Sequence, residues 1–429
     1  MPKSPVAYQP RIVDRELDEL SAALTAVALE GPKGVGKTAT ASRRAATVHS
    51  LDDPTQRDLA AAEPLRLLDD PPPILIDEWQ RLPEIWDLVR RQVDAGAPAG
   101  QFLLAGSATP ARPPTHSGAG RIVSVRMRPM ALSERGGEDA SVSLKELLSG
   151  RRPAIEGQTA WRLEDYVREI LNSGFPGIRE LSGRPLRAQL DSYLDRIVDR
   201  DFADELGHQV RNPEGLRRWL TAYAAASSTP ATFETIRDAA SAGQNNKPAK
   251  TTESAYRNAL ERLWILDPVP AWAPTRSHIR RISQPPKHQL ADPALAARLL
   301  GADADALLSG EPAGPPIPRD GTLLGALFES LVTLSVRVCA QAAEARVAHL
   351  RTRAGEHEVD LIVERGDHRV LALEVKLGRG VDDKDVAHFK WIADRIGDDL
   401  LDAAVITTGS DAYRRPDGIC VIPASLLGA

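Results

Sequence analysis

The fold of this chain is decided by residues 31–38, which read Gly31-Pro32-Lys33-Gly34-Val35-Gly36-Lys37-Thr38. They follow the apolar run Ala23 to Leu29, which predicts a buried strand that ends at a glycine-rich turn. The glycines let the backbone curl so that its N–H groups converge on phosphate oxygens, and a helix N-terminus then follows. Lys37 is expected to reach the β- and γ-phosphates, and Thr38 to hold Mg²⁺. The segment therefore predicts a nucleoside triphosphate site on an α/β sheet.

Two further apolar runs supply the polar groups that such a site needs. Residues 73–78 are typical of a buried parallel strand that ends in two carboxylates, Asp77 and Glu78. Asp77 is expected to bind Mg²⁺, usually through water, and Glu78 to orient and deprotonate the attacking water. Residues 101–106 predict a third strand, and Ser107 follows it at the edge where open α/β sheets bind ligands.

Each of these motifs also has a simpler interpretation. A glycine-rich loop can be an ordinary turn, an Asp-Glu pair can be solvated, and a serine after a strand can cap the next helix. The three motifs together favour one nucleotide site. Binding without hydrolysis stays open, because Glu78 alone distinguishes the two outcomes.

The composition is that of a globular protein with several domains. The chain has 429 residues, 42% of them hydrophobic and 26% charged. Its two cysteines exclude a disulfide framework or a structural zinc site by count. No uninterrupted apolar stretch approaches the roughly 18 residues that cross a bilayer, so we expect a cytoplasmic protein without a membrane partner. The net charge of −5 argues against coating nucleic acid through bulk charge, although local basic patches are compatible with it.

Shifts in composition divide the chain into four segments of an α/β multidomain protein. Residues 1–135 are expected to form the P-loop domain, and residues 136–213 a linker and helical region. Residues 214–300 are expected to form a winged helix-turn-helix domain, and residues 321–429 a second α/β domain behind a proline-rich linker.

The central region predicts three short helices, 216–226, 232–239 and 251–262, followed by a strand-like run from Trp264. This order is that of a winged helix, and the third helix would read DNA if the module does so. Residues 275–288 hold no acid and suit a wing that contacts phosphates. Winged helices also bind proteins, and arginine-rich hairpins are often only solvated, so both alternatives stay open. The basic residues assigned to DNA contact are Arg257, Arg276, Arg280 and Arg281, with Lys287 in the same basic segment.

The C-terminal region predicts a β-hairpin formed by residues 358–364 and 370–376. Side chains alternate along a strand, so Glu374 and Lys376 share a face, and strand pairing can bring Asp360 beside them. Two carboxylates can hold a divalent metal while a lysine positions or helps to deprotonate a water, as metal-assisted phosphodiester hydrolysis requires. Glu329, in the preceding helix, could supply another carboxylate. This arrangement resembles the PD-(D/E)xK nuclease superfamily, which also contains members that do not cut; the alternative is an exposed hairpin with a surface ion pair.

Nearly the whole chain resembles the AAA-like P-loop ATPases of bacteria and archaea that carry a C-terminal domain of unknown function. Lys33 matches the basic residue of that family's loop, whereas Ala108 stands where a second serine is common. The resemblance implies that Arg121 contacts the γ-phosphate, in cis or from a neighbouring subunit; its alternative role is to anchor a strand. The motifs that carry the resemblance are 31–38, 51–54, 76–78, 104–107, Gly120-Arg121, Arg128-Pro129, Glu134, 174–176, 193–201 and 374–376.

Three hypotheses follow from these observations. The first is an ATPase that uses ATP and Mg²⁺ and is coupled to DNA binding or processing, with nuclease activity left open. The second is a non-cutting ATP-dependent switch that binds a protein or DNA partner. The third is a structural assembly protein with a relic nucleotide site. A homo-oligomer is compatible with each of them.

Overall fold

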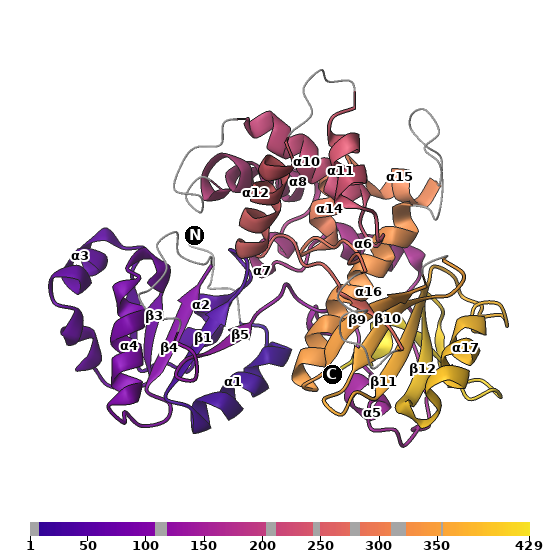
Figure 1. The fold of residues 1–429 in the computed structure, drawn as a ribbon, viewed down its shortest axis with the longest axis horizontal. Helices are drawn as coiled ribbons and strands as arrows, with labels where there is room; N and C mark the ends of the chain where they lie inside the picture. Colours follow the sequence, from indigo (N-terminus) through magenta and orange to yellow (C-terminus); the bar gives the residue numbers. More distant parts are fainter. Residues whose placement is uncertain are drawn as a thin grey trace. The chain divides into compact units, whose positions relative to one another are not determined.

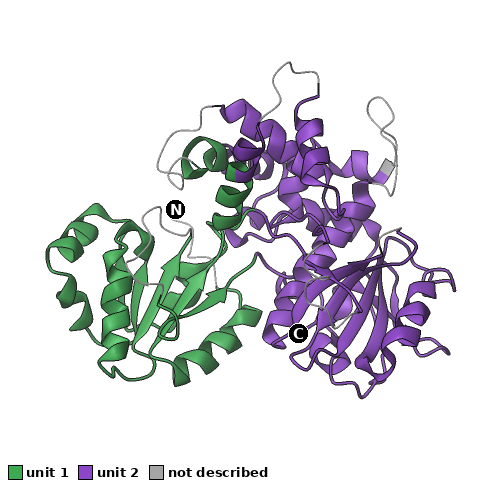
Figure 2. Ribbon diagram, in the orientation of Figure 1, with its two compact units in different colours: residues 1–128, 196–211, 255–265 green, residues 129–195, 212–254, 266–429 purple. Residues whose placement is uncertain are grey.

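The computed structural model describes residues 8–107, 118–202, 212–242, 249–274, 284–309, 323–352 and 355–429. These residues group into two compact units (Figure 2). Unit 1 comprises residues 1–128, 196–211 and 255–265, and unit 2 comprises residues 129–195, 212–254 and 266–429. The first boundary lies close to the expected end of the P-loop domain at residue 135. Most residues of the remaining three predicted segments belong to unit 2, whereas 196–211 and 255–265 belong to unit 1, so that division stays a prediction.

Unit 1 is built on a five-stranded parallel sheet in the order β2-β3-β4-β1-β5 (Figure 1). All three strands predicted around the phosphate loop are present, and β1, β3 and β4 are almost entirely buried, as continuous apolar runs require. Its strands are β1 Ala26–Glu30, β2 Thr47–Ser50, β3 Ile74–Asp77, β4 Phe102–Gly106 and β5 Val123–Arg126. Its helices are α1 Ile12–Ala23, α2 Lys37–Ser42, α3 Pro54–Ala62 and α4 Glu84–Asp94, with 3₁₀ turns η1 Pro64–Leu68 and η2 Trp79–Arg81.

The core of unit 1 follows from strand alternation. Every second residue of the central strands, such as Ile74 and Ile76 of β3, faces one apolar cluster. The apolar side of α4 and the ring of Trp79 fill the same cluster, and Trp79 lies 4.6 Å from Trp86 between ring centroids. This packing fixes the positions of the strands, and therefore the positions of the residues at the strand ends.

Unit 2 contains an eight-stranded mixed sheet in the order β7-β13-β14-β12-β11-β10-β9-β8. Along the chain, the elements at its centre follow one another in the order α16, β9, β10, β11, α17, β12. In the sheet, β10 pairs antiparallel with both β9 and β11, and β12 pairs parallel with β11. The hairpin predicted over 358–376 is confirmed, with Leu361 opposite Leu373. The elements are α16 Leu323–Ala342, β9 Arg346–Arg351, β10 Glu358–Glu364, β11 Val370–Lys376, α17 Ala387–Ile396, β12 Leu400–Thr407, β13 Asp411–Arg414 and β14 Cys420–Pro423, with edge strands β7 Gly157–Gln158 and β8 Ala271–Trp272.

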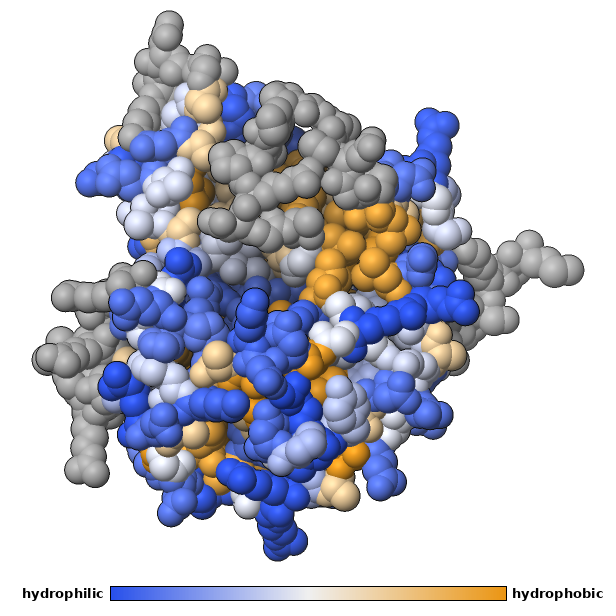
Figure 3. Space-filling model, turned by 90° about the vertical axis from the view of Figure 1, so that its right-hand side faces the viewer, coloured by the Kyte–Doolittle hydropathy of each residue, from blue (hydrophilic) through white to orange (hydrophobic). Residues whose placement is uncertain are grey.

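The remaining elements are short and mostly helical. A small separate sheet pairs β6 Val142–Ser143 with β15 Leu427–Gly428. The helices are α5 Leu144–Leu147, α6 Leu163–Leu171, α7 Pro176–Arg179, α8 Gly183–Arg196, α10 Pro213–Ala225, α11 Phe233–Ala240, α12 Lys250–Arg262, α14 Pro293–Leu299 and α15 Ala304–Ser309. Short turns are the π-helical η4 Ile197–Asp201 after α8, and the 3₁₀ turns η3 Leu132–Glu134, η5 Gly397–Asp399 and η6 Ala424–Leu426. On the face that Figure 3 shows, hydrophilic residues predominate and apolar ones gather in a few patches.

The three helices expected for a winged helix are α10, α11 and α12, and each has the predicted position in the sequence. The chain after α12 forms antiparallel bridges between Leu266 and Leu290 and between Val269 and Lys287. However, the second half of α12 groups with unit 1, whereas α10 and α11 belong to unit 2. A winged-helix module therefore stays a prediction.

Helix α16 is, among the described residues, the one helix long and apolar enough to cross a membrane. Most of its residues are buried inside the protein, as in the central helix of a globular core. In the sequence, Glu329 and Arg337 interrupt the apolar run of this helix.

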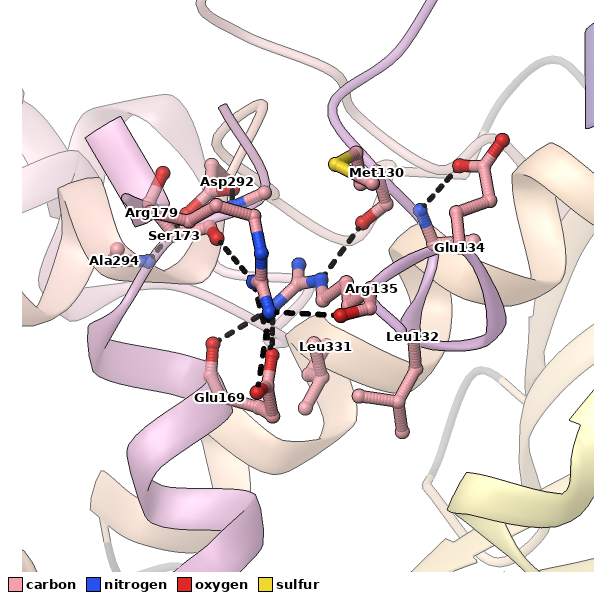
Figure 4. A network of polar contacts seen from close by, with 12 residues as sticks. Met130, Leu132, Glu134, Arg135, Glu169, Ser173, Arg179, Asp292, Ala294 and Leu331 are labelled. Carbon is pink, nitrogen blue, oxygen red and sulfur yellow. Dashed lines mark hydrogen bonds and ion pairs between the residues drawn. The ribbon is translucent and has the colours of Figure 1, made fainter. Parts of the chain in front are cut away.

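A buried ionic network holds the helical part of unit 2 together (Figure 4). Glu169 of α6 accepts hydrogen bonds from Arg135 Nη1 at 3.3 Å and from Arg179 Nη1 at 3.1 Å. Nearby, the buried Asp292 carboxylate accepts the backbone N–H of Gly174 at 2.6 Å and caps α14. Because these charges are removed from water, each depends on its partners.

Replacing Glu169 with alanine leaves two guanidinium groups without their carboxylate in a buried site. We expect this variant to lower the free energy of unfolding by about 3–5 kcal/mol, measured by urea denaturation. The matched control is Arg168→Ala on the same helix, whose exposed pair with Asp165 contributes less than about 1 kcal/mol. Equal unfolding midpoints for the two variants would contradict the structural role of the network.

Candidate nucleotide-binding site

The phosphate loop has the backbone shape that its glycines require. Gly34 and Gly36 have φ angles of 77° and 105°, in the region that disfavours side chains. A Cβ atom at Gly31 would lie 2.2 Å from the carbonyl oxygen of Met127, the residue that follows β5. Glycine at this position therefore lets the start of the loop pass directly against the neighbouring strand.

Arg11 holds the loop from its other side. This side chain, on the residue before α1, is buried; it donates from Nη1 to the Val35 carbonyl at 3.0 Å and from Nη2 to the Arg128 carbonyl at 2.8 Å. It thus ties the loop to the chain leaving β5. Arg11 was not predicted, because one arginine before an amphipathic helix has no distinctive spacing.

Lys37 lies inside the loop. It is 5% exposed, and its Nζ donates to the carbonyls of Gly31 at 2.8 Å and Pro32 at 2.9 Å. Burial lowers the pKa of Lys37 to about 8, although the carboxylates of Glu78 and Asp77 oppose the shift. An ammonium that is bound only by neutral carbonyls can transfer to a phosphate oxygen without leaving a charge unpaired.

Thr38 and Asp77 lie together, as predicted. The Thr38 hydroxyl is 3.0 Å from both Asp77 carboxylate oxygens, and Asp77 is buried at the tip of β3. Burial raises the pKa of Asp77, and Glu78 and Asp52 add to this, while the Thr38 hydroxyl and Lys37 oppose it. A hydroxyl and a carboxylate beside a phosphate loop suit Mg²⁺, a cation that prefers oxygen ligands. These residues therefore fit the predicted metal.

Glu78 and Ser107 are also brought together, since β3 and β4 are neighbours in the sheet. Ser107 Oγ donates to Glu78 Oε2 at 3.1 Å, and Gln80 Nε2 donates to the same oxygen at 2.6 Å. Glu78 has a φ of 54°, which is unusual for a residue with a side chain and often marks a functional position. Gln80 was missed because its role depends on the turn after β3.

Lys33, the other lysine of the loop, forms an ion pair with Asp201. Its Nζ lies 2.5 Å from Asp201 Oδ1, in the π-helical turn η4. The two side chains are 44% and 15% exposed. A segment about 170 residues away in the sequence therefore contacts the loop within unit 1.

Arg121 is not brought to this site within its own chain. The sheet is parallel, and Arg121 precedes β5, so it lies at the edge opposite the loop, about 15 Å away by strand length. There it pairs with Asp94 at 2.8 Å and remains 47% exposed. Arg126, at the other end of β5, lies opposite Glu30 at the edge of the sheet where the loop begins. Its guanidinium lies over the Trp264 ring, 4.6 Å from the ring centroid.

The metal site predicted at Asp360 and Glu374 contains a lysine side chain that was not expected there. Asp360 and Glu374 lie close together, and Glu329 joins them, but the ammonium of Lys287 lies among these carboxylates. Lys287 was predicted to contact phosphates on a basic wing, and this is wrong because its side chain is buried. Lys376 pairs with Asp385 instead of the cluster. Among the described residues, no group of three or more acids, histidines or cysteines has an arrangement that could hold a metal ion.

The residues assigned to DNA contact are mostly outside the described part of the chain. Arg276, Arg280 and Arg281 fall there, as does Ala108 after β4. Arg257 lies on α12 and is half-buried.

Comparisons with known proteins identify the N-terminal region. A model of an AAA domain matches residues 24–135, and models of two domains of unknown function, DUF8612 and DUF4143, match residues 163–306 and 324–427. A comparison with curated proteins gives no match. Similar solved structures include a Walker-type ATPase of Pyrococcus abyssi, with 16% identity over 67% of this chain and 94% of that chain and a TM-score of 0.38. Another is the ORC2 protein of Aeropyrum pernix, with 15% identity over 69% and 95% of the two chains and a TM-score of 0.29. Residues 24–135 are thus an AAA-type P-loop ATPase domain.

Replacing Glu78 with glutamine should separate ATP binding from turnover. The amide keeps the size of the carboxylate but cannot accept the proton of the attacking water, so we expect turnover to fall about 10²–10⁴-fold. The ATP dissociation constant should stay within about threefold of the wild-type value, as measured with a fluorescent ATP analogue. A variant that still turns over at the wild-type rate would contradict this role.

Replacing Lys37 with alanine removes the ammonium from the loop, so ATP binding and turnover should both be lost. The control is Lys145→Ala, an exposed lysine in α5 of unit 2, which should leave both unchanged. The measurement is the same fluorescence titration followed by phosphate release.

Proposed function

We propose that this chain binds and hydrolyses Mg·ATP in unit 1 and uses the nucleotide state to control DNA binding by the central region, residues 214–300. The observation that carries the first part is the convergence of Lys37, Thr38, Asp77 and Glu78 at one edge of the sheet, contributed by β3 and the loop after β1. A surface loop, a solvated acid pair and a helix cap would not place these groups together.

The chemistry follows from the positions of the side chains. The loop amides and Lys37 bind the phosphates and neutralise charge on the leaving diphosphate. When bound at Thr38 and Asp77, Mg²⁺ supplies further positive charge to the phosphate oxygens. Glu78 accepts a proton from the water that attacks the γ-phosphorus, and the products are ADP and inorganic phosphate. Ser107 and Gln80 set the orientation of Glu78 because both donate to the same carboxylate oxygen.

The contact between Lys33 and Asp201 supports coupling between nucleotide state and the rest of the chain. Helix α8 belongs to unit 2 up to Asp195, and the chain continues into η4 of unit 1, which carries Asp201. An arriving triphosphate offers Lys33 competing oxygens, so the ion pair weakens as the phosphates bind. The weakened ion pair then acts on η4, which continues directly from α8. π-Helical turns are often found at such functional positions.

DNA is the favoured partner because the basic segment 275–288 and α12 follow one another in the sequence. The second candidate is a protein partner, favoured by the net charge of −5 and by the burial of Lys287 within the same basic segment. In an assembly of several copies, the exposed Arg121 of one copy would contact the nucleotide bound to another copy. A cytoplasmic location fits both a DNA partner and a protein partner.

The direct test is ATP hydrolysis by the full chain with and without single- and double-stranded DNA. The proposal expects DNA to raise turnover, with a response that weakens as salt concentration rises. Hydrolysis that is indifferent to both forms of DNA would favour the protein-partner alternative, and an absence of hydrolysis would overturn the proposal.

Replacing Asp201 with asparagine removes the charge that pairs with Lys33. We expect the ratio of DNA-stimulated to basal turnover to change by about threefold or more, since an ion pair to the loop is lost. The control is Asp195→Asn, one helical segment earlier, which pairs with Arg217 in unit 2 and should leave the ratio unchanged. Identical ratios in both variants would remove Asp201 from the coupling.

A further inference from the structure

Lys287 lies at the centre of a carboxylate cluster in unit 2. Its Nζ is 2.7 Å from Asp360 Oδ1, 2.9 Å from Glu329 Oε1 and 3.3 Å from Glu358 Oε1. The lysine side chain is 1% exposed. These carboxylates come from α16 and β10, so the lysine joins the central helix of the unit to its sheet.

The backbone of Lys287 is fixed as firmly as its ammonium group. Its N–H donates to the Val269 carbonyl at 2.9 Å, and its own carbonyl accepts the Val269 N–H at 2.9 Å. The following residue, His288, is fully buried and bonds through Nε2 to the Ala231 carbonyl at 2.8 Å. Withdrawing the lysine from the cluster therefore requires the rearrangement of its bridge to Val269 and of the buried His288 that follows it.

The charges around Lys287 favour its ionised form. Burial alone lowers the pKa of Lys287, but Asp360, Glu329 and Glu358 outweigh that effect and raise the pKa above its usual value. Burial raises the pKa of Glu329 to about 8, and the Asp360 charge adds to this. One ammonium thus faces three carboxylates within ion-pair distance.

The other residues expected of a nuclease do not complete a metal site. Lys376 is paired with Asp385, which also accepts the Asp382 N–H at 2.8 Å. Glu374 is half-buried, and its buried Oε2 has no hydrogen-bond partner among the described residues. The Asp360 oxygen that faces away from Lys287 accepts the Val375 N–H at 2.9 Å. Both Asp360 oxygens and Glu329 Oε1 are therefore already bound by donors, and Glu374 Oε2 alone does not supply the several oxygens that a divalent cation needs.

We infer that the Lys287 ammonium is the permanent cation of this cluster, in the position that a divalent metal would need, and that unit 2 consequently does not cut phosphodiesters. A divalent cation lies about 2.0–2.6 Å from its oxygen ligands. At that distance from Asp360 and Glu329 it would touch the ammonium and be repelled by it. The inference is independent of ATP hydrolysis, which takes place in unit 1.

The test is Mn²⁺ binding to the nucleotide-free full chain, followed by electron paramagnetic resonance. Wild type and Asp360→Asn should give the same titration, because neither offers a site in unit 2. Asp77→Asn is titrated in parallel to identify weak binding at the phosphate loop. Lys287→Gln should gain Mn²⁺ affinity by at least about tenfold, and the added Asp360→Asn change should abolish that gain.

Three results would overturn the inference. The first is a Mn²⁺ site in the wild-type protein that Asp360→Asn removes while Asp77→Asn keeps it. The second is nicking of supercoiled plasmid with Mn²⁺ by wild type and by Lys37→Ala, but not by Glu374→Ala. The third is a folded Lys287→Gln protein without added Mn²⁺ affinity. If that variant does not fold, the wild-type and Asp360→Asn comparison decides alone.

Discussion

The structure of unit 1 depends on the close approach of the phosphate loop to the chain that leaves β5. Gly31 has no side chain, and the Met127 carbonyl occupies the space that a Cβ atom would take. Arg11 then joins the loop to the same segment through the carbonyls of Val35 and Arg128. The loop is consequently shaped before any nucleotide arrives, so little conformational entropy remains to be lost on binding.

Two buried lysines in this protein have opposite surroundings and, on our account, opposite roles. Lys37 is surrounded mainly by neutral carbonyls, and burial lowers its pKa to about 8. Lys287 is surrounded by carboxylates, which raise its pKa in spite of burial. The first can exchange its partners for phosphate oxygens at low cost. The second would leave several negative charges unpaired if it moved, so it is a fixed part of the fold.

The elements that could be predicted are those encoded by one continuous stretch of sequence. The strands before Gly31, Asp77 and Ser107 were predicted and are confirmed, because a buried parallel strand reads as a continuous apolar run. The hairpin that carries Asp360 and Glu374 was predicted for a similar reason. The motifs also predicted that Thr38 and Asp77 would lie together, since Thr38 lies in the loop region after β1 and Asp77 ends β3 of the same parallel sheet.

Long-range contacts were not predictable in the same way. Lys287 has basic neighbours in the sequence, and only the bridge to Val269 and the packing of α16 reveal that it is buried. Arg121 was assigned from resemblance, yet it comes before β5, and strand direction places it at the far edge of the sheet. Arg11, Gln80 and the contact of Asp201 with Lys33 depend on segments that meet only in the folded chain.

The central claim is that the backbone amides of residues 34–38 bind a triphosphate. Hydrogen–deuterium exchange of the full chain with and without Mg·ATP measures these amides directly. The account predicts slower exchange across this loop when ATP is present, with no such change in Lys37→Ala. Unchanged exchange at the loop under saturating ATP would contradict it.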